Sequence, residues 1–470
     1  MKFVIIGGSD AGISAALRVR ELAPETHITL VLADDYPNYS VCGLPFYVSG
    51  ETPQLRQLAH RTEFEGITLM KKHWAHAINA GAQTVEIEGP DGGRTQLAYD
   101  KLLIGTGARS VLPDWPGLSL RGVFALHTME DGVRLKEHLQ AHPVRSAVII
   151  GSGYIGLEMA DALTHLGLDV TLIGRSQAVL PTTDTGFGRI VEEALRAKGV
   201  RVESATTAQG IVAQGEQLAV ETDRAVVTTD IVIVAAGVRP NSEIGSAIGL
   251  ATGLHGALRV TRGMETALPN IYAAGDCVET WHRVLNRYTY LPLGTTAHKQ
   301  GRVAGENAIG GRRTFEGSLG TQVVKVFDLA IARTGLREAE AAQAGFDPVT
   351  VESHPFDHKA YYPGAQTLRI SVTGDRRSGR LLGAQMLGPW DAEVSKRIDI
   401  YAAALYHGMT VEDLNSLDLS YTPPLGSPWD AVQMAAQAWS RAALHRSVLA
   451  GVNALDSSAN QWRHGSCDST

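Results

Sequence analysis

The sequence of 470 residues has few cysteines, little net charge and no long apolar run. Its three cysteines, Cys42, Cys277 and Cys467, are too few and too far apart for a disulfide framework, and they suit a reducing compartment. The formal net charge of -7 gives no basic face for nucleic acid and no global attraction for an anionic partner. No window approaches ~18 uninterrupted apolar residues, so no transmembrane helix is expected.

The start of the chain, MKFVIIGG, runs straight into a glycine turn and lacks the apolar stretch and cleavage site of a signal peptide. We therefore predict a cytoplasmic protein without a membrane or nucleic-acid partner, and we predict no metal site. Hydrophobic residues make up 44% and glycines number 50, which is typical of an α/β enzyme with many tight turns. The length allows two or three domains.

A pattern of strand, glycine turn, helix and strand occurs twice. The first copy has an apolar strand at 2–6, a helical stretch that ends near Pro24, and a second apolar strand at 28–33. The second copy spans 146–173 and reads SAVIIGSGYIGLEMADALTHLGLDVTLI. Its return ~140 residues later predicts two dinucleotide-binding domains in one chain.

Each copy carries a glycine loop of the kind that lets a backbone approach a pyrophosphate at a helix N-terminus. In the first loop, Gly7 and Gly12 hold the first and third places of the fingerprint, and Ser9 replaces the middle glycine. The second loop is a full G-x-G-x-x-G. The glycines predicted to bind cofactors in these loops are Gly7, Gly8, Gly12, Gly151, Gly153 and Gly156.

The residues that follow each second strand predict which dinucleotide binds there. After the first, Leu32 and Ala33 stand where an acid usually holds the ribose hydroxyls, so Asp34 or Asp35 must serve. We prefer Asp34 because it is closer to the strand end.

After the second strand, Gly174 offers no acid, and Arg175 and Ser176 can grip a 2′-phosphate. This favours NADPH over NADH, unless Arg175 is merely solvated.

Two further strand and glycine segments, at 228–241 and 268–277, precede the C-terminal part of the chain. In NIYAAGDC, Asp276 lies just past a strand end, where a carboxylate could hold a ribityl hydroxyl of FAD. Gly107, Gly237 and Ala297 complete the predicted cofactor contacts.

From about residue 320 the pattern changes to antiparallel strands with polar turns, and helices follow at 391–408 and 428–443. This predicts an α+β domain. Residues 444–470 are polar and are expected to form a loosely ordered tail.

Cys42 lies in NYSVCGLPFYVSG, where Gly43 and Pro45 argue against an ordinary helical core residue. We expect a thiol near the flavin, with its pKa lowered so that the thiolate is the reactive species. The alternative is a buried, inert cysteine. A C-x4-C redox pair would need a second cysteine at the position that Tyr47 holds, so an internal disulfide is excluded at this site.

Together these motifs resemble the pyridine nucleotide–disulfide oxidoreductases over about 1–443. The glycine loops, GTGA at 105–108 and AAGDC are shared by the superfamily, and the single cysteine in SVCGLPFY resembles the coenzyme A-disulfide reductases and NADH oxidases. The resemblance implies that Cys42 sits at the flavin face and cycles through a mixed disulfide or a sulfenic acid. It also implies that Glu158 lies near the contact between nicotinamide and flavin.

The resemblance further implies a homodimer with shared active sites. Tyr361 in AYYPGA and Tyr421 in DLSYTPPLGSPWD match tyrosines that the partner subunit places near the cysteine, although both could be structural interface residues. Asp10 stands where peroxidase and oxidase relatives commonly carry a histidine, which lowers the peroxidase prediction. Cys467 could relay electrons from the tail, but a bystander is favoured.

The sequence thus predicts an α/β protein with two Rossmann-like domains and a C-terminal α+β dimerisation domain. FAD would use 1–113 and 253–320, NADPH 114–252, and the dimer interface 321–443. We predict the reduction of a low-molecular-weight disulfide or persulfide through Cys42. An NAD(P)H oxidase or a reductase for a thiolate-bound metal or metalloid is the alternative. An electron-transfer flavoprotein is disfavoured because such proteins typically lack the cysteine.

Overall fold

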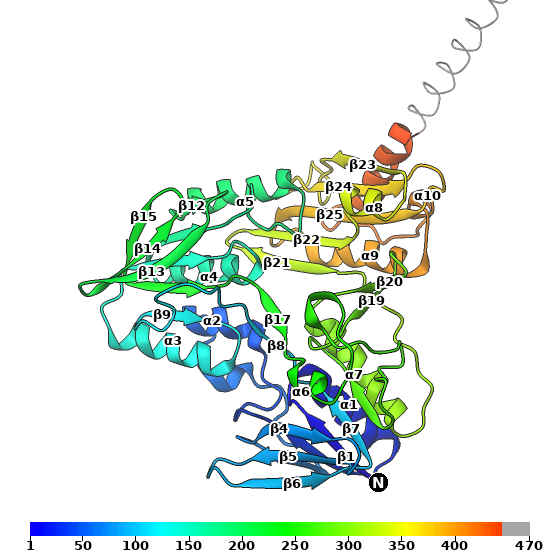
Figure 1. Ribbon diagram of the computed structural model, residues 1–470. Coiled ribbons are helices and arrows are strands. Elements are labelled where there is room, and N and C mark those ends of the chain that lie inside the picture. The colour runs from blue at the N-terminus through cyan, green and yellow to red at the C-terminus, as the bar shows by residue number, and fades with distance from the viewer. Residues whose placement is uncertain (444–470) are drawn as a thin grey trace, which may run out of the picture. The chain divides into compact units, whose positions relative to one another are not determined.

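Strand β1 (Lys2–Ile6) lies at the centre of the first parallel sheet in the computed structural model, which describes residues 1–443 (Figure 1). Four of its five residues are buried, as expected where helices cover both faces of a parallel sheet. The sheet has the order β18-β7-β1-β2-β3. The other strands are β2 (His27–Val31), β3 (Ile67–Met70), β7 (Lys101–Ile104) and β18 (Ile271–Ala273).

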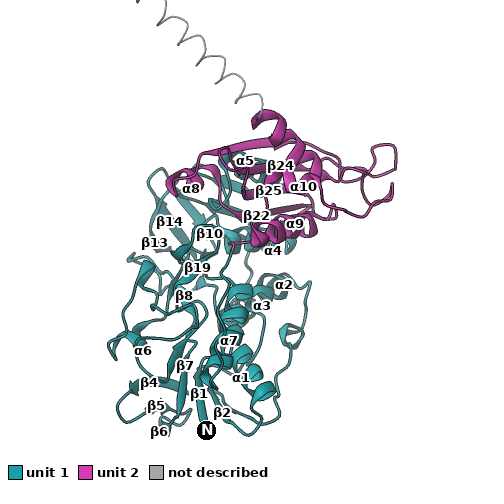
Figure 2. Ribbon diagram, turned by 90° about the vertical axis from the view of Figure 1, so that its right-hand side faces the viewer, with its two compact units in different colours: residues 1–318 teal, residues 319–470 magenta. Residues whose placement is uncertain are grey.

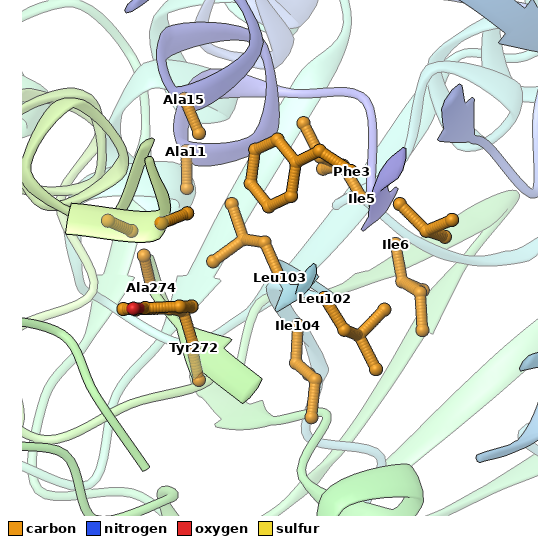
Figure 3. Close-up of a cluster of buried hydrophobic side chains, with 14 of the residues drawn as sticks. Phe3, Ile5, Ile6, Ala11, Ala15, Leu102, Leu103, Ile104, Tyr272 and Ala274 are labelled. Atoms are coloured by element: carbon orange, nitrogen blue, oxygen red, sulfur yellow. The ribbon is translucent and has the colours of Figure 1, made fainter. Parts of the chain in front are cut away.

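Helices α1 (Asp10–Leu22) and α7 (Gly294–Ala308) pack against each other through glycines. A Cβ on Gly301 would lie 2.1 Å from the Ala11 carbonyl oxygen, and one on Gly305 would lie 2.5 Å from that of Ala15. Only glycine allows this approach, which brings the beginnings of the two helices together. In Figure 3, side chains from β1, β7, β18 and α1 meet in one buried cluster.

The second parallel sheet repeats the first. Its order is β12-β11-β10-β16-β9, and β10 (Ser146–Ile150) is followed by α4 (Tyr154–His165) and β11 (Asp169–Ile173). The other strands are β9 (Val123–Ala125), β12 (Arg201–Glu203) and β16 (Ile231–Val234). The two predicted strand–glycine–helix–strand units are therefore confirmed.

Smaller elements surround these two sheets. The helices are α2 (Leu44–Ser49), α3 (Met129–Ala141), α5 (Thr185–Ala197) and α6 (Glu243–Ser246), with short 3-10 turns η1 (Val41–Gly43), η2 (Leu55–Leu58) and η3 (Leu254–Gly256). The antiparallel groups are β4 (Trp74–Asn79) with β5 (Thr84–Glu88) and β6 (Arg94–Ala98), β13 (Ala208–Gln214) with β14 (Gln217–Thr222) and β15 (Val226–Thr229), β8 (Ala108–Ser110) with β17 (Val238–Pro240), and β19 (Thr280–His282) with β20 (Arg287–Thr289).

The chain divides into two compact units after Ser318 (Figure 2). The second unit has an antiparallel sheet of order β21-β22-β25-β24-β23, so the predicted α+β domain is confirmed. Its elements are β21 (Gln322–Val326), β22 (Leu329–Gly335), α8 (Glu338–Gln343), β23 (Pro348–Ser353), β24 (Arg369–Asp375), β25 (Leu381–Pro389), α9 (Val394–His407), α10 (Val411–Asn415) and a helix whose described part spans 431–443.

Two further predictions concern the tail and membrane-spanning helices. The expected polar tail at 444–470, with Cys467, lies outside the described residues. Among the helices of residues 1–443, none has the length and apolar character needed to cross a membrane.

Candidate active site

The two glycine loops fold in the same way. Gly7 has φ of 113° and donates its N–H to Val31 at 2.9 Å, while Gly151 has φ of 119° and donates to Ile173 at 2.8 Å. Positive φ at this point is a conformation that favours glycine. Each turn places the start of a helix, α1 or α4, at the carboxyl end of its sheet, where backbone N–H groups without helical partners can receive a pyrophosphate.

Neighbouring backbone also presses on these turns. A Cβ on Gly7 would lie 2.0 Å from the oxygen of Gly105, and one on Gly151 would lie 2.1 Å from that of Ala235. At the third fingerprint position, a Cβ on Gly12 would lie 1.9 Å from the Gly7 oxygen. The same contact in the second loop joins Gly156 to the Gly151 oxygen at 1.8 Å. By contrast, a Cβ on Gly153 would meet open space, as expected beside a ligand.

The two loops differ in which of two facing positions carries a side chain and which carries glycine. A Cβ on Gly8 would lie 2.0 Å from Leu32 Cδ2. In the second copy the glycine is at the strand end, and a Cβ on Gly174 would lie 2.2 Å from Ser152 Oγ. In the first loop the strand-end side chain is large and the loop residue small, and in the second the sizes are reversed. Leu32 therefore fills the place where the sequence fingerprint expects an acid.

The structure separates the two candidate acids for the FAD ribose. Asp34 is partly buried, burial raises the pKa of its carboxyl, and one oxygen accepts the Tyr36 N–H at 2.9 Å. Asp35 is exposed and forms ion pairs with Lys71 and Lys72 at 3.5 and 3.2 Å. Asp34 thus retains an oxygen for a hydroxyl donor, and it stays our prediction for this role.

Asp276 follows β18 and tests whether FAD fits this fold. Within residues 1–443 its carboxylate has no hydrogen bond, and burial, followed by the charge of Asp10, raises its pKa to about 6. A buried carboxylate without donors is costly, and a row of ribityl hydroxyls would supply them. The residues present therefore fit FAD.

The other predicted cofactor residues line the same unit. Gly107 and Gly237 have positive φ, and a Cβ on either would meet open space. Ala297 is buried in α7, 3.7 Å from the Cβ that Gly275 lacks. Arg175 is exposed just after β11 with no partner among the described residues, and Ser176 follows it.

Cys42 lies in η1, immediately before α2, and is an exposed free thiol. The alternative of a buried cysteine is therefore wrong for Cys42, whereas Cys277 is fully buried. The expected low pKa is also wrong for the protein alone. Desolvation by surrounding atoms raises the pKa of Cys42, and the charges of Glu158, Asp10 and Asp276 raise it further.

Glu158 is brought to Cys42 by the packing of α2 on α4. Burial, and then the charge of Asp161, raises the pKa of Glu158 to about 7. Cys42, Glu158 and Asp276, which lie far apart in the sequence, are thus close enough for their charges to interact.

Tyr361 and Tyr421 lie together in the second unit. Desolvation, and then the interaction with the Tyr361 side chain, raise the pKa of Tyr421. The Lys359 N–H donates to the Pro423 carbonyl at 3.3 Å, which ties the two segments together. Tyr361 is 72% exposed and Tyr421 44% exposed, so both are free to meet another surface.

One group near the site was missed in the sequence. His298, on α7, places Nε2 3.4 Å from Asp10 and Nδ1 2.7 Å from Ser14 Oγ. Asp10 was noted as a departure from relatives, but its imidazole partner comes from a helix almost 300 residues away, and only the glycine contacts between α1 and α7 reveal it.

Comparison with known proteins identifies the family. Residues 1–301 match the pyridine nucleotide-disulphide oxidoreductase model, and residues 321–431 match the dimerisation domain of the same proteins. The chain belongs to the pyridine nucleotide-disulphide oxidoreductases. As a member of this family it is a flavin-dependent oxidoreductase that uses FAD and a nicotinamide cofactor, as the motifs predicted.

Relatives of this oxidoreductase support the predicted branch. The NAD(P)H sulfur oxidoreductase (CoA-dependent) of Pyrococcus furiosus is 36% identical over 91% of this chain and 97% of its own length. The coenzyme A disulfide reductase of Staphylococcus haemolyticus is 30% identical over 92% and 98%. The structure of an NAD-dependent persulfide reductase from A. fulgidus has a TM-score of 0.89 and 38% identity, and the match covers 93% of this chain and 82% of that one.

A further solved relative bears on the nicotinamide cofactor. An engineered water-forming NADPH oxidase, bound to NADPH, has a TM-score of 0.91 and 25% identity, and the match covers 95% of this chain and all of that one. Its parent, from Lactobacillus brevis, was solved with NADH. Among the substitutions that separate the two, three consecutive ones turn Asp-Ala-Met into Ala-Arg-Ser.

The raised pKa of Glu158 predicts that this residue lowers the free energy of unfolding as the pH rises. The fold favours the protonated carboxyl, so the stability that it contributes is full below about 4.5 and is lost as the pH rises to about 7. Glu158→Gln mimics the protonated form and should raise the free energy of unfolding at pH 8 by roughly 1–3 kcal/mol, with a smaller gain at pH 5. Urea unfolding at both pH values measures this. Glu193→Gln, on the exposed side of α5, is the control. An equal gain at pH 5 and pH 8 would contradict the argument.

Proposed function

We propose that this enzyme uses NADPH to reduce a low-molecular-weight disulfide or persulfide through Cys42. The observation that carries the proposal is an exposed free thiol beside the FAD-type glycine loop. The Asn38 N–H donates to the Gly8 carbonyl at 3.1 Å, so the segment leading to Cys42 is fastened to that loop. Relatives named as sulfur oxidoreductase, persulfide reductase and coenzyme A disulfide reductase support this choice of substrate.

The cofactors would divide the first unit between them. FAD would use 1–113 and 253–320, with Gly7, Gly12, Asp34 and Asp276 as its main contacts, and the nicotinamide cofactor would use 114–252. When bound, FAD supplies the two-electron link between NADPH and the thiol site. Glu158 would lie where these two cofactors meet, and its buried carboxyl would hold or release a proton near neutral pH.

Cys42 would act as the nucleophile. Its thiolate attacks one sulfur of the substrate, the substrate S–S bond breaks, and a mixed disulfide with Cys42 forms while the other half leaves as a thiolate. Tyr47 excludes an internal disulfide here, and its ring lies 3.9 Å from the Lys136 ammonium. The interacting phenols of Tyr361 and Tyr421, from the partner subunit, would protonate the leaving thiolate.

The preference for NADPH rests on the residues after β11. Gly174-Arg175-Ser176 resembles the Ala-Arg-Ser of the engineered NADPH oxidase more than the Asp-Ala-Met of its NADH-bound parent. The register is supported by two further substituted positions in that enzyme. By the same spacing, its parent's glycine and proline correspond to Gly156 and Pro181, so at these two positions this chain has the parent's residues.

An NAD(P)H oxidase is the second candidate. The relative just described forms water from oxygen. Asp10, in place of the histidine that oxidase relatives commonly carry, makes this the weaker proposal, and oxygen uptake measured beside disulfide reduction separates the two.

Cys42→Ser should separate the two halves of the reaction. Serine cannot form a mixed disulfide, so disulfide reduction should fall by several orders of magnitude, while flavin reduction by NADPH stays nearly intact. Anaerobic stopped-flow absorbance measures both halves. Cys277→Ser, at a buried cysteine far less accessible to substrate, controls for loss of a thiol. Full turnover by Cys42→Ser with every accepted substrate would mean that the thiol mechanism is wrong.

Wild-type enzyme should show a higher kcat/KM with NADPH than with NADH. Arg175→Ala should lower kcat/KM for NADPH roughly tenfold to a hundredfold, because a charge-assisted hydrogen bond is worth roughly 1.5–3 kcal/mol. The value for NADH should change little, and Arg201→Ala, at the exposed start of β12, is the control. Gly174→Glu supplies the missing acid and should reverse part of the preference for NADPH. It must be combined with Ser152→Gly, because the new Cβ would otherwise meet Ser152. Equal losses with both cofactors would remove the argument for a phosphate contact.

A shared active site predicts complementation between inactive chains. A mixed dimer of Cys42→Ser and Tyr361→Phe/Tyr421→Phe chains contains one site with an intact cysteine and intact tyrosines. Coexpression under two affinity tags and purification of the mixed dimer should therefore give disulfide reduction well above either parent. An active monomer by sedimentation, or a mixed dimer no better than its parents, would exclude the shared site.

A further inference from the structure

The charges that act most strongly on Cys42 are negative. Glu158, Asp10 and Asp276, in that order, are the charges that raise the pKa of its thiol most. Thiols that act as nucleophiles usually lie in electropositive surroundings. Glu158 and Asp276 have proposed roles beside the cofactors. Asp10 has none, so its charge needs another explanation.

The position of Asp10 is set by three small residues that contact one another. A Cβ on Gly275 would lie 3.0 Å from the Ala11 Cβ and 3.7 Å from the Ala297 Cβ. The residues next to these in the chain are Asp10, Asp276 and His298. Asp10 is paired with His298, and its charge acts on Asp276. Ala11 and Ala297 are both buried.

The carboxylate of Asp10 is itself held in place. A Cβ on Gly294, the first residue of α7, would lie 2.6 Å from Asp10 Oδ2, so the absence of a side chain there makes room for this oxygen. The other oxygen lies 3.4 Å from His298 Nε2, and His298 Nδ1 lies 2.7 Å from Ser14 Oγ. A serine hydroxyl can donate or accept, so it serves both protonation states of the ring.

His298 offsets only part of this negative charge. The side chain of His298 is 51% exposed and that of Asp10 36% exposed. Ion pairs between side chains open to water are weak, and this one has a positive member only while the imidazole is protonated. The approach to Cys42 therefore remains negative overall.

We propose that Asp10 is a specificity residue that selects disulfides and persulfides whose group next to the reactive sulfur is cationic or uncharged. This rests on the proposed function and adds the charge class of the substrate. An anionic group within a few ångströms of the sulfur would meet Asp10, whereas phosphates or carboxylates carried farther along the molecule would be screened. The pair with His298 positions the carboxylate.

Charged methanethiosulfonates test the proposal without turnover. The Cys42 thiolate attacks the reagent's divalent sulfur, a new S–S bond forms, and the reagent's own S–S bond breaks as sulfinate leaves with the electron pair. For each protein we take the rate constant of the cationic 2-(trimethylammonium)ethyl reagent divided by that of the anionic 2-sulfonatoethyl reagent. In wild type this factor should be roughly tenfold larger than for a free thiol, and in Asp10→Asn only about threefold larger. The protein is the FAD-loaded dimer carrying Cys467→Ser, and intact mass follows modification.

Asp91→Asn, at the turn between β5 and β6, is the matched control and should leave the factor unchanged. Raising the ionic strength should shrink the factor for wild type more than for Asp10→Asn. A wild-type factor equal to that of a free thiol overturns the proposal, and so does a factor that Asp10→Asn leaves unchanged.

Turnover with matched disulfides completes the test. The kcat/KM should be highest for the cationic cystamine, lower for the neutral 2-hydroxyethyl disulfide and lowest for the anionic 3,3′-dithiodipropionate. Asp10→Asn should reduce the differences in kcat/KM among the three. If Cys42→Ser abolishes turnover but the order is flat, the specificity proposal fails and the proposed function stands. If the reagents show the cationic preference but Cys42→Ser retains turnover, the proposed function fails instead.

Discussion

Close backbone contact at the glycine turns is the constraint on which the rest of the site depends. The oxygens of Gly105 and Ala235 lie where Gly7 and Gly151 would carry side chains, so each helix can begin only at the carboxyl end of its central strand. Helix α7 also packs on α1 through glycines that contact backbone atoms. Without these contacts Asp276, His298 and Asp10 would not meet, and the segment before Cys42 would have no loop to be fastened to.

The parts of the fold with a local signal could be predicted from the sequence. Both parallel sheets follow from apolar runs that end in glycine, and the antiparallel sheet of the second unit follows from polar turns between alternating strands. The small antiparallel groups, such as β13 to β15, carry weaker patterns and were not anticipated. Element bounds shifted by up to three residues, because the signals at element ends are weak and helices fray there.

The site was harder to predict because its decisive features are relations between distant residues. Leu32 looked like a missing acid, but it fills space that Gly8 leaves, and Ser152 with Gly174 reverses that arrangement. The choice between Asp34 and Asp35 depends on Lys71 and Lys72, which bind the second of them. A spacing rule sees neither relation. The expected low pKa of Cys42 failed for the same reason, since its neighbours come from three separate segments.

The raised pKa values of Cys42, Glu158 and Asp276 have one physical origin. Each group loses water to the protein, and each lies close to other negative groups. Hydroxyl donors would relieve Asp276, and protonation relieves Glu158, whereas the proposed reaction needs Cys42 as the thiolate, which the same charges disfavour. The field that disfavours its thiolate also disfavours any anion beside it. A neutral or cationic group at the substrate sulfur would avoid that repulsion, so under our proposal the same carboxylates would govern thiol reactivity and substrate choice.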